Sequence, residues 1–532
     1  MYSTVIYGGS IIDGTGAKQY QADIALQDEK IAAIAPNLRS EEARIRINAE
    51  GLVIAPGFID IHSHTDASIF RNPLAESKIM QGITSDVIGN CGIGAFPVME
   101  DKLVELEKYL ALHNHESPPA ASSWHTFAEY ADALDHIGLG LNLVPLAAHG
   151  TLRIAAMGSE DREPTAQEMA KMESLLEQAL QEGVWGLSTG LIYPPGSFAH
   201  TTELINLSRI LAKYNALYAS HVRGESSTLL TAVDEAIAIG KASGVRIEIS
   251  HLKAIGRPNW GMAKQALAKI EAVRREGIDI AADQYPYTAT STGLTALVPG
   301  WAHAGGVAAM LARLADPLLH DRLCQDINQE MQIRGGADKV MITNLESIGA
   351  EHLSGKTIAE IAKIWACRED IAVIRLLTAT AGAVGAVYFS LSDLDLENII
   401  VNPEVSVGTD GYALNAQSDA ATATHPRSYG TFARVLGLYV REKKLLSWET
   451  AIHKMTAVPS TRLGLKDRGL VKEGLAADLT IFDPATVQDC ADFLHPHRYP
   501  AGIEYVFVNG QAVVANGQVT GASPGKVFRR VD

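Results

Sequence analysis

Apolar runs of strand-like composition recur through the middle of the chain and alternate with segments of helical periodicity. The clearest helical patterns cover residues 168–182 and 229–243, where Ala, Leu, Glu and Lys dominate. The apolar runs lie at residues 58–63, 83–89, 139–147, 184–188, 216–221, 245–250, 278–283 and 404–409. Buried strands that alternate with helices are typical of an α/β protein with a parallel sheet. The pattern therefore predicts a (β/α)8 barrel over residues 57–464.

Both ends of the chain have a different sequence pattern, in which short apolar runs are separated by turn residues. Residues 1–56 show this pattern, and it returns after about residue 465, where 477–483 has the composition of a strand. The pair Asn509-Gly510 stands between two further apolar runs and predicts a β-hairpin. We expect residues 1–56 and 465–532 to pair into one small β-sandwich domain beside the barrel.

A long segment separates the seventh predicted strand from the eighth. It contains helical stretches at 307–333 and 357–380 and a loop rich in small residues near Thr288. Connections of this length are usually functional lids or carry structure of their own. The sequence therefore predicts an inserted lid or subdomain at about 287–346.

Composition and charge exclude some classes of protein and leave the predicted barrel and β domain unchanged. The chain has 532 residues, of which 47% are hydrophobic and 20% charged, and a formal net charge of −16. This acidic balance argues against nucleic-acid binding, and no basic cluster suggests an anionic membrane surface. The chain starts without the features of a signal peptide, and no apolar run approaches the roughly 20 residues that span a bilayer. We therefore expect a cytoplasmic protein.

The spacing of the cysteines also fits a cytoplasmic protein. The cysteines lie far apart and show no CxxC spacing, so a disulfide framework is not expected. They are Cys91, Cys324, Cys367 and Cys490.

Ligand-type residues follow five of the predicted strands. His62 and His64 come after the first strand, and side chains two residues apart in a strand point the same way. A (β/α)8 enzyme carries its reactive groups at the carboxyl ends of its strands, so these residues should converge on one face. Imidazole, thiolate and carboxylate together form a metal-ligand set, with polar caps of strand ends as the alternative. The set is His62, His64, Cys91, His221, His251 and Asp410.

Four short motifs in a fixed order resemble the amidohydrolase superfamily. They are HSH at 62–64, GNCG at 89–92, SHLK at 250–253 and GTDG at 408–411. Many members carry a carboxylated lysine after the fourth strand, but residues 187–191 contain none. Cys91 after the second strand resembles instead the D-aminoacylases (N-acyl-D-amino-acid deacylases), as do GLIYPP, DQYPY and HPR at 190–195, 283–287 and 425–427.

The resemblance covers nearly the whole chain and implies roles for the ligand-type residues. Cys91, His221 and His251 would hold a tightly bound Zn²⁺, and His62 and His64 would frame with Cys91 a second, weaker metal position. Zinc lowers the pKa of a bound water toward about 7. Asp410 would then act as general base and acid on this metal-activated water.

The resemblance also implies the residues that hold the substrate carboxylate. Cationic and hydroxyl groups suit such a carboxylate, and the matching positions are Lys253, Tyr285, Ser291 and Arg427. Arg223 is a lower-ranked candidate. A basic residue of the lid would favour acidic amino-acid side chains, whereas an apolar lining would favour hydrophobic ones. The candidates for that residue are Arg313, Arg322 and Arg334.

The resemblance therefore implies a zinc-dependent hydrolase that cleaves N-acyl-D-amino acids to a carboxylate and a free D-amino acid. The preference for the D form comes from the resemblance alone. One alternative is a cyclic-amide hydrolase of the dihydroorotase or hydantoinase type, against which Cys91 and the missing lysine argue. The other is a non-catalytic barrel scaffold, against which the complete ligand set with Asp410 argues. The expected partner is a small N-acyl amino acid, with the oligomeric state open.

Overall fold

The computed structural model describes residues 1–114, 123–343, 345, 350–420 and 423–530. The last residues of the predicted 287–346 insertion and of the predicted terminal domain thus fall partly outside the described residues. No helix within these ranges is long and apolar enough to cross a membrane.

Parallel strands follow one another around a ring in the order of the sequence. β8, β9 and β10 pair in turn, and β11 to β15 continue through β19. Only Leu146 separates β10 from β11, and a parallel bridge between Ser63 and Gly411 joins the ends of β8 and β19. The strands are β8 (Phe58–Asp60), β9 (Ile83–Ile88), β10 (Asn142–Pro145), β11 (Ala147–Ala148), β12 (Gly186–Gly190), β13 (Leu217–His221), β14 (Arg246–Ile249), β15 (Ile280–Gln284) and β19 (Val405–Val407). The predicted α/β fold with parallel strands is confirmed, and a strand lies at every predicted position.

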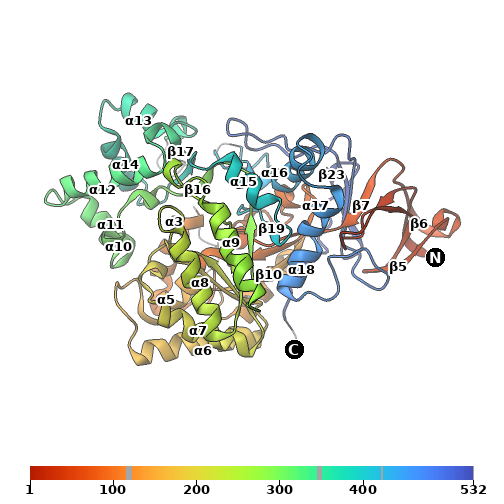
Figure 1. The fold of residues 1–532 in the computed structure, drawn as a ribbon, viewed down its shortest axis with the longest axis horizontal. Coiled ribbons are helices and arrows are strands. Elements are labelled where there is room, and N and C mark those ends of the chain that lie inside the picture. Colours follow the sequence, from red (N-terminus) through yellow and green to blue (C-terminus); the bar gives the residue numbers. More distant parts are fainter. Residues whose placement is uncertain (115–122, 344, 346–349, 421–422, 531–532) are drawn as a thin grey trace.

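Helices pack around the outside of this ring (Figure 1). The predicted helix at 168–182 is α6 (Ala166–Glu182), which begins at a capping box in which Thr165 and Glu168 bond each other's backbone N–H. The predicted helix at 229–243 is α8 (Leu229–Ser243), which ends at Gly244 in a left-handed conformation. Further helices between or after the barrel strands are α7 (Thr201–Lys213), α9 (Met262–Arg275), α15 (Asp393–Ile400), α17 (Trp448–Met455) and α18 (Ala457–Leu463).

The two chain ends meet in one mixed sheet. β7 (Val53–Pro56) pairs in parallel with β2 (Ser10–Ile11) and antiparallel with β20 (Leu479–Phe482). A second sheet, in the order β5-β4-β1-β6, shares an apolar core with it. The other strands are β1 (Tyr2–Tyr7), β3 (Tyr20–Gln21), β4 (Asp23–Gln27), β5 (Lys30–Ala35), β6 (Ala43–Asn48), β21 (Ile503–Val508), β22 (Gln511–Ala515) and β23 (Gln518–Val519). The bounds 1–56 and 465–532 of a separate small domain stay a prediction.

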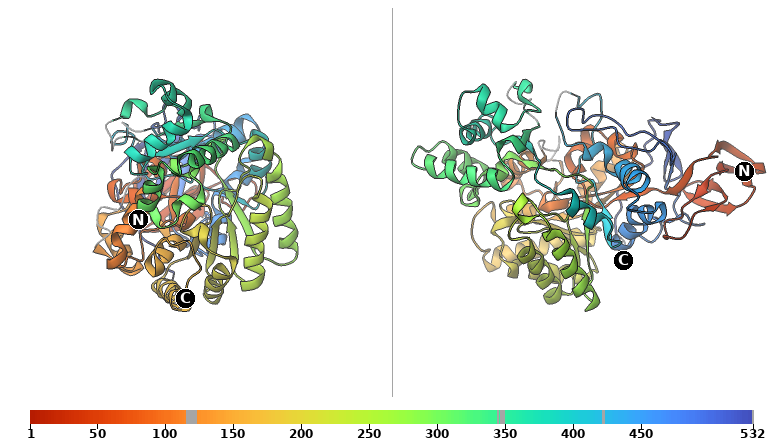
Figure 2. Two further views of the ribbon diagram at one scale, coloured as in Figure 1. Left: turned by 90° about the vertical axis from the view of Figure 1, so that its left-hand side faces the viewer. Right: turned by 45° about the horizontal axis from the view of Figure 1, so that its top comes forward.

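The segment between β15 and β19 has structure and a core of its own. β16 (Thr290–Gly293) and β17 (Val340–Ile342) pair antiparallel with β18 (Gly385–Tyr388). Their apolar core is separate from that of the barrel. The helices are α10 (Gly300–His303), α11 (Gly306–Leu314), α12 (His320–Ile333), α13 (Ile358–Ile364) and α14 (Glu369–Ala379). They lie at the opposite end of the molecule from the N-terminal strands (Figures 1 and 2). Both sides of residue 346 thus contribute to this insertion.

A buried lysine ties the barrel strands together beneath the predicted metal ligands. Lys78, on α2 (Glu76–Ile79), is fully buried, and its Nζ donates to Asp60 Oδ2 and to Thr409 Oγ1, both at 2.7 Å. The same Nζ lies 3.5 Å from Asp86 Oδ2. Removing one member of such a buried pair costs about 3–5 kcal/mol, because the other charge is left without compensation. The network therefore fixes the ends of β8 and β9 against the loop that carries Asp410.

Candidate metal centre

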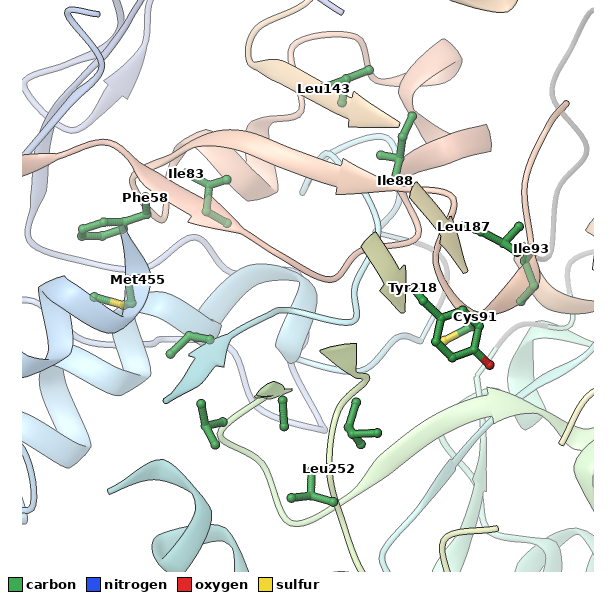
Figure 3. Close-up of a cluster of buried hydrophobic side chains, with 14 of the residues drawn as sticks. Phe58, Ile83, Ile88, Cys91, Ile93, Leu143, Leu187, Tyr218, Leu252 and Met455 are labelled. Carbon is green, nitrogen blue, oxygen red and sulfur yellow. The ribbon is translucent and has the colours of Figure 1, made fainter. Parts of the chain in front are cut away.

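A tight turn after β9 places Cys91 at the mouth of the barrel. At Gly89, which has a φ of +80°, an added Cβ would lie only 2.2 Å from the Leu146 carbonyl oxygen, so the turn requires glycine here. Asn90 Nδ2 supports the turn by donating to the Val87 carbonyl at 2.9 Å. Cys91 is buried within the apolar core that also contains Ile88 (Figure 3). Cys91 is only 2% exposed, so its thiol is shielded from bulk solvent.

The Cys91 thiol lies close to nitrogen atoms of three histidines. Its Sγ is 3.3 Å from His62 Nε2, 3.3 Å from His251 Nε2 and 3.6 Å from His221 Nδ1. With metal–nitrogen bonds of about 2.05 Å and metal–sulfur bonds of about 2.3 Å, tetrahedral geometry puts neighbouring ligand atoms about 3.4–3.6 Å apart. The thiol thus lies about one ligand–ligand spacing from a nitrogen of each histidine. All four side chains are buried, as expected for a tight site.

Asp410 closes the other side of the cluster. Its Oδ1 lies 3.0 Å from His64 Nε2 and 3.6 Å from His62 Nε2. Ligand atoms of His62, Cys91, His251 and Asp410 all lie within 4.8 Å of one another. The structure therefore brings together every predicted metal ligand. Because Cys91 is equally near to His62 and to His251, the division into a tight and a weak metal position stays a prediction.

Three of these residues have a strained backbone. The φ angles of Cys91, His251 and Asp410 are +55°, +36° and +49°, in the left-handed region that residues other than glycine rarely adopt. Each costs of order 1–3 kcal/mol and persists only where its surroundings hold it. The His251 N–H donates to Asp283 Oδ1 at 2.8 Å, and the Asp410 N–H donates to the His62 carbonyl at 2.7 Å. Strain gathered at one strand-end cluster is typical of a functional site.

Glu225 is a site residue that the sequence analysis missed. Its Oε2 lies 3.3 Å from His221 Nε2, and its Oε1 lies 3.3 Å from His251 Nδ1. Carboxylates placed at the second nitrogen of a histidine fix the tautomer and the ring orientation of a metal ligand. Asp283 Oδ2, 3.4 Å from His62 Nδ1, has the same relation to a third histidine. The only hint of Glu225 in the sequence was its position four residues after His221. This spacing brings side chains together in a helix, but these residues lie in a loop.

Replacing Glu225 with glutamine is expected to weaken metal binding about 10–100-fold, because the amide removes the negative charge that lies 3.3 Å from a nitrogen of each of the two histidines. Competition with a chelator measures this affinity. Glu235→Gln is the matched control, since Glu235 pairs with Arg223 and Thr201 away from the thiol. An unchanged affinity in Glu225→Gln would show that the histidines are oriented without it.

The electrostatics of the cluster favour ionised ligands. Burial alone would raise the pKa of the Cys91 thiol, but His62 and His251 hold this pKa well below its usual range. Burial would likewise raise the pKa of the Asp410 carboxyl, but Arg427, followed by His251, holds it well below its usual range. Both groups therefore carry a negative charge at neutral pH. A thiolate is the form in which cysteine binds a metal.

The predicted substrate-binding residues line one pocket above this cluster, together with His64 and Tyr193. Arg427 Nη1 donates to Asp410 Oδ2 at 2.5 Å, and its Nη2 donates to the Ser291 carbonyl at 3.1 Å. Lys253 Nζ donates to Glu225 Oε1 at 2.5 Å. Both cations face the Tyr285 ring, whose centroid lies 4.8 Å from Arg427 Cζ and 5.7 Å from Lys253 Nζ. The structure thus brings these residues together.

The lower-ranked candidate Arg223 lies outside this inner pocket. Its Nε donates to Glu235 Oε2 at 2.8 Å, and its Nη atoms donate to the carbonyls of Ser197 and Ala199, each at 2.8 Å. These bonds hold the loop after β12 to α8. Arg223 therefore has a structural role at the rim of the site.

This barrel with its strand-end ligands is that of an amidohydrolase. Residues 46–319 and 408–514 match the sequence model of the Amidohydrolase family. The chain belongs to this family.

Its relatives define the subgroup more narrowly. The chain is 38% identical to an N-acyl-D-glutamate deacylase of Alcaligenes xylosoxydans xylosoxydans, over 99% of this chain and 96% of the relative. The structure of N-acyl-D-glutamate deacylase from Bordetella bronchiseptica, complexed with zinc and a phosphonate inhibitor that mimics the tetrahedral intermediate, matches with a TM-score of 0.84, 35% identity and 99% coverage of both chains. A D-aminoacylase with a binuclear metal centre matches with a TM-score of 0.83, 34% identity and full coverage of both chains. The resemblance to the D-aminoacylase subgroup is confirmed.

Proposed function

We propose that this protein is a zinc-dependent hydrolase that cleaves the amide bond of N-acyl-D-amino acids, releasing a carboxylate and a free D-amino acid. The observation that carries the proposal is the Cys91 thiol, 3.3–3.6 Å from nitrogen atoms of His62, His221 and His251, with Asp410 beside it. The full-length similarity to an N-acyl-D-glutamate deacylase supports the linear amide substrate and its D configuration.

The donor set supports zinc as the metal. A thiolate and neutral imidazoles are the ligands that zinc prefers, and the relative from Bordetella bronchiseptica is complexed with zinc. We place the tight ion on Cys91, His221 and His251, and a weaker second position on His62, His64 and Cys91. The D-aminoacylase relative, in which one metal activates and a second attenuates, supports this inequality. When bound, zinc polarises the amide carbonyl and lowers the pKa of water.

Asp410 moves the proton in this proposal. Its carboxylate is ionised at neutral pH and faces the ligand cluster through Oδ1. It accepts a proton from the attacking water and returns it to the nitrogen of the leaving amine. Arg427, bonded to the other oxygen, keeps the carboxylate oriented.

The α-carboxylate of the substrate lies against Lys253, Tyr285, Ser291 and Arg427 in this proposal. A guanidinium has five N–H donors, and Arg427 uses only some of them on Asp410 and the Ser291 carbonyl. The Tyr285 hydroxyl is buried without a hydrogen-bond partner in the part of the chain that the structure describes, so it is free to donate to an anion. The pocket thus offers charge and a directed hydroxyl to one carboxylate.

A panel of N-acetyl-D- and N-acetyl-L-amino acids, assayed beside dihydroorotate and hydantoin on one metal-analysed sample, tests this function. We expect hydrolysis of at least one N-acetyl-D-amino acid and little turnover of the L forms. Turnover of the cyclic amides alone would favour the cyclic-amide alternative. A complete lack of turnover by zinc-loaded protein would favour a scaffold.

A further inference from the structure

The insertion contains three arginines that were candidates to contact a substrate side chain. The structure gives each of them different surroundings. Arg313 Nη1 donates to the carbonyl of Ala302 at 2.9 Å and so holds the insertion together. Arg322 stacks on Trp301 with its side chain 63% exposed. Arg334 alone of the three lines the pocket that contains His64, Lys253 and Arg427.

Arg334 is held at the wall of this pocket by neighbours on both sides. It follows α12 directly, and its Cζ lies 4.7 Å from the centroid of the Tyr388 ring. The Tyr388 hydroxyl donates to the Gly293 carbonyl at 3.1 Å, which ties this support to β16. At Gly256 an added Cβ would lie 2.3 Å from the Ile333 carbonyl oxygen, so the loop after Lys253 packs closely on the end of α12. The arginine thus has a fixed place beside the substrate residues.

Within the described part of the chain, the guanidinium of Arg334 has no anionic partner. Its residue is 9% exposed, yet none of its side-chain N–H groups makes a hydrogen bond or an ion pair with the described residues, and Nε is buried without any partner. By contrast, Lys253 is paired with Glu225, and Arg427 is paired with Asp410. A buried charge without a partner is costly unless a ligand supplies one. Of these three cations, Arg334 is therefore the one that no acidic side chain of the described residues pairs with.

We propose that Arg334 binds a carboxylate on the substrate side chain, so that the enzyme selects N-acyl-D-amino acids with an acidic side chain. This inference rests on the proposed function and names its substrate class. Similarity alone does not show which substrate side chain is preferred, because the relatives include both an N-acyl-D-glutamate deacylase and a D-aminoacylase. We infer the preference for an acidic side chain from the unpaired guanidinium in the wall of the pocket.

The space beyond the metal ligands is large enough for such a side chain. A cavity of about 390 Å³ opens from the site and is also lined by Arg334, with Tyr193, Ile255 and Glu225. Glu330 lies on the same cavity, one helical turn before Arg334, but forms no ion pair with it. An anion from the substrate thus meets a free guanidinium there, whereas a purely apolar side chain would leave the charge unpaired.

The test compares N-acetyl-D-glutamate with its neutral isostere N-acetyl-D-glutamine in zinc-loaded enzyme. We expect wild type to prefer the acid, and Arg334→Gln to lower kcat/KM for the acid roughly 10–100-fold while the amide changes less than about 3-fold. Arg334→Lys should recover part of the preference because it restores the charge. Arg322→Gln is the matched control, because Arg322 is exposed on α12, the helix that Arg334 directly follows, and this variant should leave the ratio unchanged.

The outcomes separate this inference from the function on which it rests. An equal loss for both substrates in Arg334→Gln, with zinc content and thermal midpoint as in wild type, would assign Arg334 to the α-carboxylate and overturn the inference. An unchanged ratio would overturn it as well. In both cases hydrolysis by wild type would leave the proposed function standing, whereas wild type without activity on any N-acetyl-D-amino acid would overturn both.

Discussion

Replacing Cys91 with alanine is expected to abolish tight zinc binding and to lower kcat/KM for an N-acetyl-D-amino acid at least about 10³-fold. The thiolate lies within 3.6 Å of nitrogens of His62, His221 and His251, so its loss opens the cluster at its centre. Without the metal, the several kcal/mol of transition-state stabilisation that a Lewis acid supplies are lost. Metal analysis after gel filtration, followed by steady-state kinetics on the same sample, measures both effects.

Cys367→Ala is the matched control for this substitution. Cys367 is half-buried on the insertion, packed against its core, and not part of the metal-ligand groups found among the described residues. Its variant should keep the zinc content and the activity of wild type. A full equivalent of tightly held zinc in Cys91→Ala would contradict the ligand assignment.

Asp410→Asn is expected to lower kcat roughly 10²–10⁴-fold, the range that general acid–base catalysis supplies. The amide has nearly the shape of the carboxylate but cannot accept a proton in its place. It also leaves Arg427 without its charged partner, so KM should change as well. Because the cysteine and histidine donors remain, the tightly bound zinc should be retained.

Steady-state kinetics with metal analysis again separate these effects. Asp489→Asn is the control, because Asp489 pairs with Arg434 and is not among the residues that line the pocket above the metal cluster. Full hydrolytic activity in Asp410→Asn would refute its role in proton transfer. Loss of zinc from Asp410→Asn would instead assign Asp410 to metal retention.

Much of the barrel was predictable because its signals are local. The helix at 229–243 has its periodicity and its terminal glycine within one stretch of sequence, and α8 has these bounds. The strand-end rule then predicted which distant residues meet, because parallel barrel strands all end on the same face. His62, Cys91, His251 and Asp410 come from distant parts of the chain and still lie within bonding range of one metal.

Residues that depend on loop conformation were not predictable in this way. Glu225 lies in the loop after β13, and only the path of that loop brings its two oxygens to His221 and His251. Lys78 is a lysine on a short helix and would be expected at the surface, yet it is fully buried between Asp60 and Asp86. Arg334 could not be distinguished from Arg313 and Arg322, because the fold of the insertion decides which of them reaches the pocket.

The most direct measurement of the central claim is the rate of D-amino-acid release by one sample of protein before and after metal removal. Chelator-treated protein should hydrolyse N-acetyl-D-amino acids at less than about 1% of the original rate, since the Lewis acid supplies several kcal/mol. Titration with Zn²⁺ should restore the rate at the first equivalent if, as proposed, Cys91, His221 and His251 hold one tightly bound ion. Hydrolysis at the full rate by protein shown to contain no metal would contradict a zinc-dependent deacylase.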